Sequence, residues 1–233
     1  MISVLIGAYN AEDFIAEAIE SVLRQSYKDL ELIVVDDGST DQTRQAVESF
    51  SKLAVQYHFQ ANKGAAAARN QAVRLSRGEY LAFLDADDAW TERKLELQMS
   101  EFADDPLLEA VFGMVQQVSQ HEWEQKLLET PGSDSELLKG YTQATMLIKR
   151  ESFLRIGPFT EDRTVGEFVD WLLRAKESNL NTKLLPHLFL RRRIHNNNLG
   201  IRKRSEINDY LKVLKESIDR RRVTGSDKRP SDI

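Results

Sequence analysis

The sequence predicts an α/β protein with a central, mostly parallel sheet flanked by helices. Over the first ninety residues, four short apolar runs alternate with three helical patterns, and this β-α-β-α-β-α-β order favours parallel strands covered on both faces. The runs 30–35 and 80–84 are largely apolar, which is typical of strands buried on both sides. Acidic residues follow both runs, at the strand ends where ligands bind in such sheets.

The expected elements follow in chain order. The first half should hold strands at 3–6, 30–35, 53–59 and 80–84, and helices at 12–25, 42–51 and 65–76. In 12–25 the apolar side chains recur every three or four residues, and Thr40 or Asp41 can cap the next helix. Beyond residue 90 the pattern loosens, with helices expected at 91–102, 150–156, 166–178 and 206–222, strands at 110–118, 142–148, 182–185 and 189–193, an irregular stretch at 123–140 and a disordered end from 223.

Length and charge predict one domain with a basic appendage. The 233 residues suit a single α/β domain over 1–200, with a donor-nucleotide half (1–100), an acceptor half (101–200) and a basic helix and tail (201–233). A net charge of −5 argues against a general nucleic-acid binder. Residues 202–233 hold ten Lys/Arg and six Asp/Glu, a local +4 that leaves −9 elsewhere. Such a tail suits either an anionic partner or membrane surface, or a solvated helix.

Three absences bear on the expected compartment. No apolar run approaches the ~18 residues that cross a bilayer, the chain starts directly with a strand rather than a signal peptide, and there are no cysteines. We therefore expect a cytoplasmic protein, with peripheral contact to the inner face of the membrane through the basic tail.

Three carboxylates follow the strand 80–84. Asp85, Asp87 and Asp88 repel one another unless a cation joins them. Hard oxygen ligands suit Mg²⁺ or Mn²⁺, and Mg²⁺ is typically shared between one or two carboxylates and a substrate's phosphates. The cluster predicts either a metal site for a phosphorylated ligand or a solvated acidic loop that caps the helix from Thr91.

Further polar residues lie at the same predicted sheet edge. Tyr9 can stack on a nucleobase or pack in the core, and Asp37 can bind a base or ribose or cap a turn. Gly38 allows either a close ligand approach or a turn with positive φ. Arg69 lies among alanines, where its guanidinium meets either a ligand anion or a neighbouring aspartate.

In this order and spacing, the motifs resemble the family 2 glycosyltransferases, which have the GT-A fold. The resemblance rests on Tyr9-Asn10, Ser21 to Tyr27, Glu31 to Asp41, Asn62-Lys63-Gly64, Ala68-Arg69-Asn70 and Gly78 to Asp88, with weaker matches to about His195. It implies an inverting enzyme that moves a sugar from a nucleotide-diphosphate sugar, with a UDP-sugar favoured, using Mg²⁺ or Mn²⁺. It also implies roles for individual residues: Ala8, Tyr9 and Asp37 hold the nucleoside, Lys63 and Arg69 lie near the nucleotide, and Asp85 and Asp87 form the DXD motif with Asp87 as direct metal ligand. Ala8 departs from the proline that the family often has there.

The acceptor side is marked by a second resemblance. The segment 166–174 is similar to the family's acidic helix, but Phe168 stands at its second acidic position. An inverting displacement needs a general base near the acceptor hydroxyl. Glu167 and Asp170 are the candidates, because their i, i+3 spacing lets both face the cleft. Asp170 is favoured, since Glu167 also suits a role at the helix dipole.

Two further expectations concern the C-terminal half. Arg193 and His195 match an arginine-x-histidine of the family that reaches the metal or diphosphate, with a structural histidine as the alternative. The loop 196–200 is expected to close over the donor.

Two other functions compete with sugar transfer. A nucleotidyltransferase would need a glycine-rich basic loop after the first strand, where this chain has 7–10, Gly-Ala-Tyr-Asn. A non-catalytic sugar-nucleotide binder is permitted by the acid missing at Phe168. The acceptor, which can be a carbohydrate, a lipid-linked sugar or a peptide, is left open by the sequence, as are the sugar, the linkage and the oligomeric state.

Overall fold

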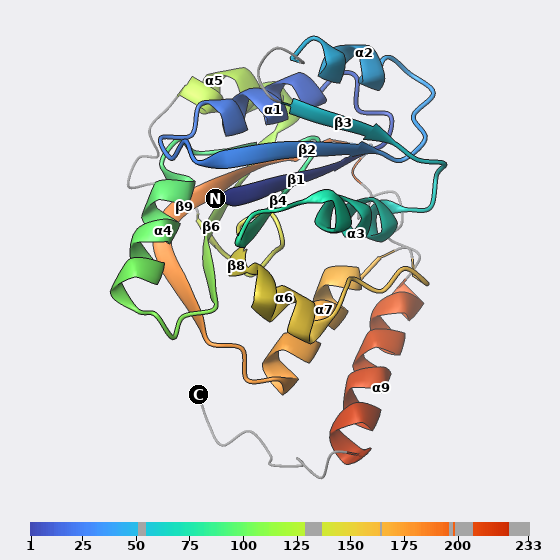
Figure 1. The fold of residues 1–233 in the computed structure, drawn as a ribbon. Helices are drawn as coiled ribbons and strands as arrows, with labels where there is room; N and C mark the ends of the chain where they lie inside the picture. Colours follow the sequence, from blue (N-terminus) through green and yellow to red (C-terminus); the bar gives the residue numbers. More distant parts are fainter. Residues whose placement is uncertain (51–54, 129–136, 164, 196–197, 199–206, 224–233) are drawn as a thin grey trace.

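The computed structural model describes residues 1–50, 55–128, 137–163, 165–195, 198 and 207–223. Within these residues one mixed sheet runs in the order β3-β2-β1-β4-β8-β6-β9-β5, and β7 pairs with β6 beside it (Figure 1). The strands are β1 Ile2–Ala8, β2 Leu30–Asp36, β3 Val55–Phe59, β4 Tyr80–Asp85, β5 Ala89–Trp90, β6 Ala110–Ser119, β7 Leu138–Gly140, β8 Leu147–Lys149 and β9 Thr182–Ile194.

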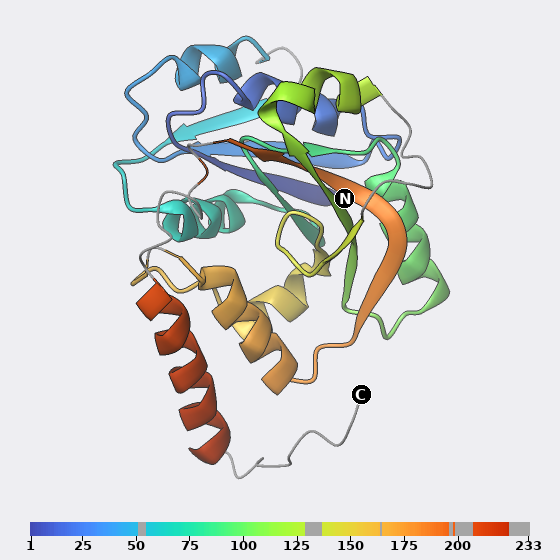
Figure 2. The ribbon, with the colours of Figure 1, turned by 180° about the vertical axis from the view of Figure 1, so that it is seen from behind.

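Helices cover both faces of the sheet (Figures 1 and 2). One face carries α1, α2 and α5, and the other carries α3, α6 and α7. The helices are α1 Ile15–Leu23, α2 Thr43–Glu48, α3 Ala65–Leu75, α4 Lys94–Asp104, α5 Trp123–Leu128 (after a 3-10 turn, Gln120–Glu122), α6 Arg150–Ile156, α7 Glu167–Glu177 and α9 Ile207–Val223.

The four strands of the N-terminal half are parallel, as the alternating order predicts. β1 pairs with both β2 and β4, so Ile6 lies beside Val34 on one side and Leu84 on the other. Side chains alternate between the faces: Ile6 packs in the core below α1, and Leu5 in the core below α3. The register therefore brings the carboxyl ends of β1, β2 and β4 to one edge of the sheet.

The C-terminal half differs from its expected elements in three places. The expected strands 182–185 and 189–193 form one strand, β9, whose register against β6 shifts near Met114. The expected strand 142–148 narrows to β8, because Thr142 to Met146 close hydrogen-bonded turns. The expected irregular stretch 123–140 contains α5 and β7.

β9 returns the chain to the edge where the N-terminal strands end. It runs parallel to β6 and antiparallel to the short β5. Its last residues therefore lie near those that follow β4, and the backbone N–H of Arg193 donates to Asp88.

The C-terminal helix α9 confirms the helix expected over 206–222. It packs against α7 and extends from the body of the molecule (Figures 1 and 2). None of the helices described here is long and apolar enough to span a membrane. The expected disordered end, and the expected closing loop except for Asn198, lie outside the described residues.

Candidate active site

A cavity of about 1250 Å³ opens at the edge of the sheet where β1, β2 and β4 end. We refer to it as the strand-end cavity. Asp88 of the acidic cluster lines it, together with nine of the eleven candidate catalytic, nucleotide-binding and metal-binding residues: Ala8, Tyr9, Asp37, Lys63, Arg69, Asp85, Asp87, Glu167 and His195. Arg193 and Asp170 are outside this lining.

Asp37 shapes the wall of the cavity by holding the turn at 62–64. Its buried carboxylate accepts the backbone N–H groups of Lys63 (2.9 Å) and Gly64 (2.7 Å) and the side-chain amide of Gln60 (2.7 Å). Gly38 follows with φ 81°, and a Cβ there would lie 2.8 Å from the backbone nitrogen of Asn62. Both the positive φ and the close approach therefore require glycine. The group that comes close to Gly38 is the backbone of the turn at 62–64.

Tyr9 lies at the rim of the cavity with 51% of its surface exposed, so it is not a core residue. The turn that carries it is tied to the turn after β2. The Asn10 backbone N–H donates to the Ser39 hydroxyl (2.9 Å), and the Asn10 side chain accepts the Thr40 backbone N–H (2.9 Å). An exposed ring on a braced turn is a suitable stacking surface for a flat ligand.

Arg69 pairs with two carboxylates that are far apart in the sequence. One guanidinium nitrogen lies 2.7 Å from Asp85, and another lies 2.8 Å from Glu167 at the start of α7. The structure thus contains the ion pair that the sequence left as one of two possibilities. Burial alone would lower the pKa of Arg69, but the two carboxylates outweigh it and raise that pKa.

Asp87 is held by the segment that follows β9. Its Oδ2 lies 3.0 Å from His195 Nε2 and accepts a hydrogen bond from Asn198 (3.0 Å). The imidazole of His195 stacks on Phe14, with ring centroids 4.6 Å apart. This stacking and the Asn198 bond fix the orientation of both side chains.

The acids after β4 have pKa values shifted in opposite directions. Burial would raise the pKa of Asp85, but the charge of Arg69 outweighs it and lowers that pKa. Burial raises the pKa of Asp87, and the neighbouring charge of Asp85 raises it further. Burial and the charges of Asp87 and Asp85 raise the pKa of Asp88 well above its ordinary value. The cluster therefore carries excess negative charge that a bound cation would relieve.

The donor atoms fit a divalent cation that shares its ligands with a substrate. Asp85, Asp87 and His195 line one cavity, and carboxylate oxygens suit Mg²⁺ and Mn²⁺. Among the described residues, no group of three or more His, Cys, Asp or Glu side chains could hold a metal ion by itself. Mg²⁺ characteristically completes its shell with phosphate oxygens and water.

Arg193 does not reach the strand-end cavity, contrary to the expectation that it faces the diphosphate. Its buried guanidinium lies between the rings of Trp123 (3.9 Å) and Phe14 (4.9 Å) and pairs with Glu17 (2.7 Å). It lines a neighbouring cavity of about 890 Å³. Side chains alternate along β9, so Arg192, rather than its neighbour Arg193, lines the strand-end cavity.

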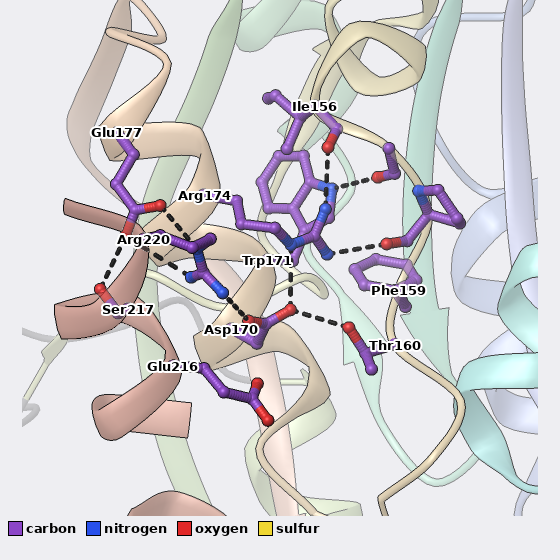
Figure 3. A network of polar contacts seen from close by, with 12 residues as sticks. Ile156, Phe159, Thr160, Asp170, Trp171, Arg174, Glu177, Glu216, Ser217 and Arg220 are labelled. Atoms are coloured by element: carbon purple, nitrogen blue, oxygen red, sulfur yellow. Dashed lines mark hydrogen bonds and ion pairs between the residues drawn. The ribbon is translucent and has the colours of Figure 1, made fainter. Parts of the chain in front are cut away.

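Asp170 faces α9 instead of the cavity, so the expectation that both acids of α7 share the cleft is wrong. Figure 3 shows its carboxylate between Arg220 of α9 and Thr160. It accepts hydrogen bonds from Thr160 (2.8 Å) and Arg174 (2.9 Å) and lies 3.3 Å from Arg220. The side chain is 2% exposed. Side chains three positions apart on an α-helix differ in direction by about 300° around the axis. Here that difference is enough to direct Glu167 to the cavity and Asp170 to α9.

Asp170→Asn is expected to lower the free energy of unfolding by about 3 kcal/mol, because two guanidinium groups lose a buried partner. Burial would raise the pKa of Asp170, but the bonds from Thr160 and Arg174 outweigh it and lower that pKa below 3.8. The stabilisation is therefore complete above about pH 4 and is lost as pH falls through the lowered pKa. Thermal unfolding between pH 3 and pH 7 should show the gap between wild type and variant closing only at the acid end.

The matched control is Asp219→Asn, which alters an exposed acid of α9 that lies 3.8 Å from Arg222. It should change stability by less than about 0.5 kcal/mol. Equal melting temperatures for Asp170→Asn and Asp219→Asn at pH 7 would contradict a structural role for Asp170.

Comparison with known families identifies the fold and its lineage. The profile of the family described as "Glycosyl transferase family 2" matches residues 3–160, about two thirds of the chain. The chain belongs to glycosyl transferase family 2. The fold is the GT-A fold, as expected from the motifs.

Curated relatives of this family 2 glycosyltransferase match part of its length. The putative teichuronic acid biosynthesis glycosyltransferase TuaG of Bacillus subtilis is 44% identical over 102 residues, 42% of this chain and 40% of that protein. WfgD of Escherichia coli, a UDP-Glc:alpha-D-GlcNAc-diphosphoundecaprenol beta-1,3-glucosyltransferase, is 45% identical over 101 residues, 43% of this chain and 40% of that protein. The matched stretches therefore span less than half of these relatives.

Solved structures of two glycosyltransferases share the fold over most of the chain. Staphylococcus aureus TarS 1–349, in complex with UDP-GlcNAc, aligns with a TM-score of 0.68 and 24% identity, covering 84% of this chain and 59% of that one. The mannosyltransferase PcManGT of Pyrobaculum calidifontis, in complex with GDP-Man and Mn²⁺, aligns with a TM-score of 0.68 and 23% identity over 94% of this chain and 64% of that one. At these identities the likeness establishes the fold.

Phe168 marks where this family 2 member departs from the acidic helix of its family. Its ring is buried and stacks on Trp171 at 5.8 Å, within an aromatic cluster that includes Phe159. A buried aromatic side chain thus occupies the position at which the resemblance implies a second acid.

The sequence did not single out several polar residues of the cavity, among them Gln143, Arg192 and Asn198. Gln143 donates to Asp85 (3.0 Å), Asn198 binds Asp87, and Arg192 lines the wall. The alternation along β9 could have distinguished Arg192 from Arg193. Gln143 and Asn198 lie in irregular segments, where no sequence period indicates orientation.

Proposed function

We propose that this chain transfers a sugar from a nucleotide-diphosphate sugar to an acceptor hydroxyl, with inversion and with help from a divalent metal. The observation that carries the proposal is the convergence of Asp37, Asp85 and Asp87 with Lys63 and Arg69 in one cavity. Carboxylates and cations at neighbouring strand ends suit a ligand that has both hydroxyls and a diphosphate.

The donor would lie along the strand ends. The exposed ring of Tyr9 offers a stacking surface for the base, next to the turn that Asp37 holds. Lys63 and Arg192 line the same cavity and supply positive charge for the diphosphate. A UDP-sugar is the favoured donor, because the relative WfgD is by its name a UDP-Glc-dependent enzyme.

Asp85 and Asp87 would hold the metal, with His195 beside Asp87. When bound, a divalent cation neutralises the charge that develops on the leaving diphosphate. Without the cation, burial and the charge of Asp85 raise the pKa of Asp87, so the charged form of Asp87 is disfavoured until a cation binds. His195 and Asn198 keep the Asp87 carboxylate aimed at one position.

Glu167 is the base that we propose for the acceptor. In the displacement, the acceptor oxygen forms a bond to the anomeric carbon as the bond between that carbon and the diphosphate oxygen breaks. The diphosphate oxygen keeps the electron pair of the broken bond. The acceptor proton passes to a carboxylate. Glu167 lines the cavity and accepts from Arg69 through Oε1, which leaves Oε2 for the acceptor.

The acceptor class that we propose is a lipid-linked saccharide. The name of WfgD specifies a diphosphoundecaprenol-linked sugar as its acceptor, and that of TuaG places it in polysaccharide biosynthesis. The competing function is a non-catalytic sugar-nucleotide binder, which the burial of Phe168 at an acidic position of the family favours.

Calorimetric titration with UDP, GDP and dTDP, each with and without Mn²⁺, tests the proposal. We expect UDP to bind at least tenfold more tightly with Mn²⁺ than without, because its diphosphate supplies metal ligands beyond those that the described residues offer. Release of UDP from a panel of UDP-sugars, without any acceptor, then separates an enzyme from a binder. Absence of metal-dependent binding to all three nucleotides would refute the proposed donor site.

A further inference from the structure

The C-terminal helix α9 has a fixed inner face and an apolar outer face. On the inner side Val213 is fully buried, and Ser217 and Arg220 bind Glu177 of α7 at 2.6 and 2.8 Å. Arg163 pairs with Glu216 at 3.0 Å. Figure 3 shows this side of α9 facing α7. These contacts fix the rotation of the helix about its axis, so the opposite face must point outward.

The outer face presents a row of large apolar side chains. Leu211, Leu214 and Ile218 are 58%, 50% and 42% exposed, and their i, i+3, i+7 spacing places them on one side of the helix. We call these three residues the apolar stripe. The cations Lys215 and Arg222 are also exposed, and their helical positions place them along one border of the stripe.

Charge identifies the surface that this stripe suits. Helix α9 (207–223) carries five Lys/Arg and three Asp/Glu, a net +2, on a chain whose remainder carries −7. An anionic lipid surface attracts the first and repels the second, which orients the molecule with α9 toward it. An apolar stripe bordered by cations is the pattern of a helix that lies in the plane of a membrane interface. A purely hydrophobic partner would leave the cations without a role.

We propose that α9 docks the protein on an anionic lipid surface through the apolar stripe and its bordering cations. Tyr210 lines the strand-end cavity at the N-terminal part of α9, and it directly precedes Leu211 of the stripe. Docking therefore holds the rim of the cavity beside the lipid headgroups. A saccharide linked to a membrane lipid could then reach the cavity without leaving the bilayer. The docking itself does not depend on the proposed function.

Vesicle flotation of the full chain tests the proposal. Wild type should float with vesicles containing phosphatidylglycerol and phosphatidylcholine at a 3:7 ratio, and not with pure phosphatidylcholine. The double variant Leu211→Glu/Leu214→Glu should bind at least tenfold more weakly, because two apolar side chains that docking would bury become charged. Lys215→Glu/Arg222→Glu should weaken binding roughly tenfold at low salt and abolish most of its salt dependence.

The matched control is Leu107→Glu, which charges an exposed leucine far along the chain, between α4 and β6. It should float like wild type. Calorimetry with UDP and Mn²⁺ should give the same affinity for wild type and for all α9 variants, which separates docking from the donor site. The proposal is overturned if wild type does not float, if the stripe variants float normally, or if light scattering shows a wild-type dimer that the variants dissociate without any vesicle binding.

Discussion

Asp87→Ala is expected to abolish the metal dependence of nucleotide binding and to lower turnover by roughly a hundredfold or more. Asp87 is the acid that His195 and Asn198 orient in the strand-end cavity, and its replacement removes one of the two carboxylates proposed to hold the metal. Titration of UDP into wild type and variant, with and without Mn²⁺, measures the effect directly. The two variant titrations should coincide.

The control for this variant is Asp104→Ala, which removes an exposed acid at the end of α4 and should leave both titrations unchanged. If Asp87→Ala retained the wild-type gain from Mn²⁺, the metal would have to be held elsewhere. The assignment of Asp85 and Asp87 would then be wrong.

Glu167→Gln is expected to lower the rate of UDP release from a UDP-sugar by 10²-fold or more, with less than about a threefold change in UDP affinity. The amide keeps the shape of the side chain and can still accept a bond from Arg69, but it cannot take a proton at neutral pH. Single-turnover rates and calorimetric affinities for the same preparations separate chemistry from binding.

Asp170→Asn is the matched control, because it makes the same change on the same helix, on the face away from the cavity. At a temperature where it is folded, it should turn over at the wild-type rate. The opposite result, slow turnover by Asp170→Asn and unchanged turnover by Glu167→Gln, would identify Asp170 as the base, as the sequence favoured. Equal rates for both variants and wild type would mean that neither acid takes the proton.

The sequence was most informative about the strand ends. The parallel order of β1, β2 and β4 follows from alternation alone, and parallel strands end at one edge. That is why Tyr9, Asp37 and Asp85 could be placed together before any coordinates were known. Their convergence on one edge of the sheet needed no information beyond pattern and topology.

Side-chain direction was the part that pattern could not supply. The spacing of Glu167 and Asp170 is compatible with a shared face. However, Arg220 of α9 lies on the other side of α7, and the buried carboxylate of Asp170 pairs with it because an unpaired buried charge is costly. Arg193 was drawn inward in the same way by Glu17 and Trp123. The direction of Asp170 depends on an element distant in sequence, so a local motif cannot determine it, whereas the direction of Arg193 could have been inferred from the alternation of side chains along β9.

The bridge from Asp85 through Arg69 to Glu167 has a thermodynamic consequence. One guanidinium serves both acids, so a change in the charge of either acid alters the free energy of the other. If, as proposed, Asp85 holds the metal of the donor and Glu167 meets the acceptor, the binding of the two substrates is coupled through Arg69, and the coupling free energy is identical in both directions. Whatever factor a bound donor imposes on acceptor affinity, a bound acceptor must impose on donor affinity.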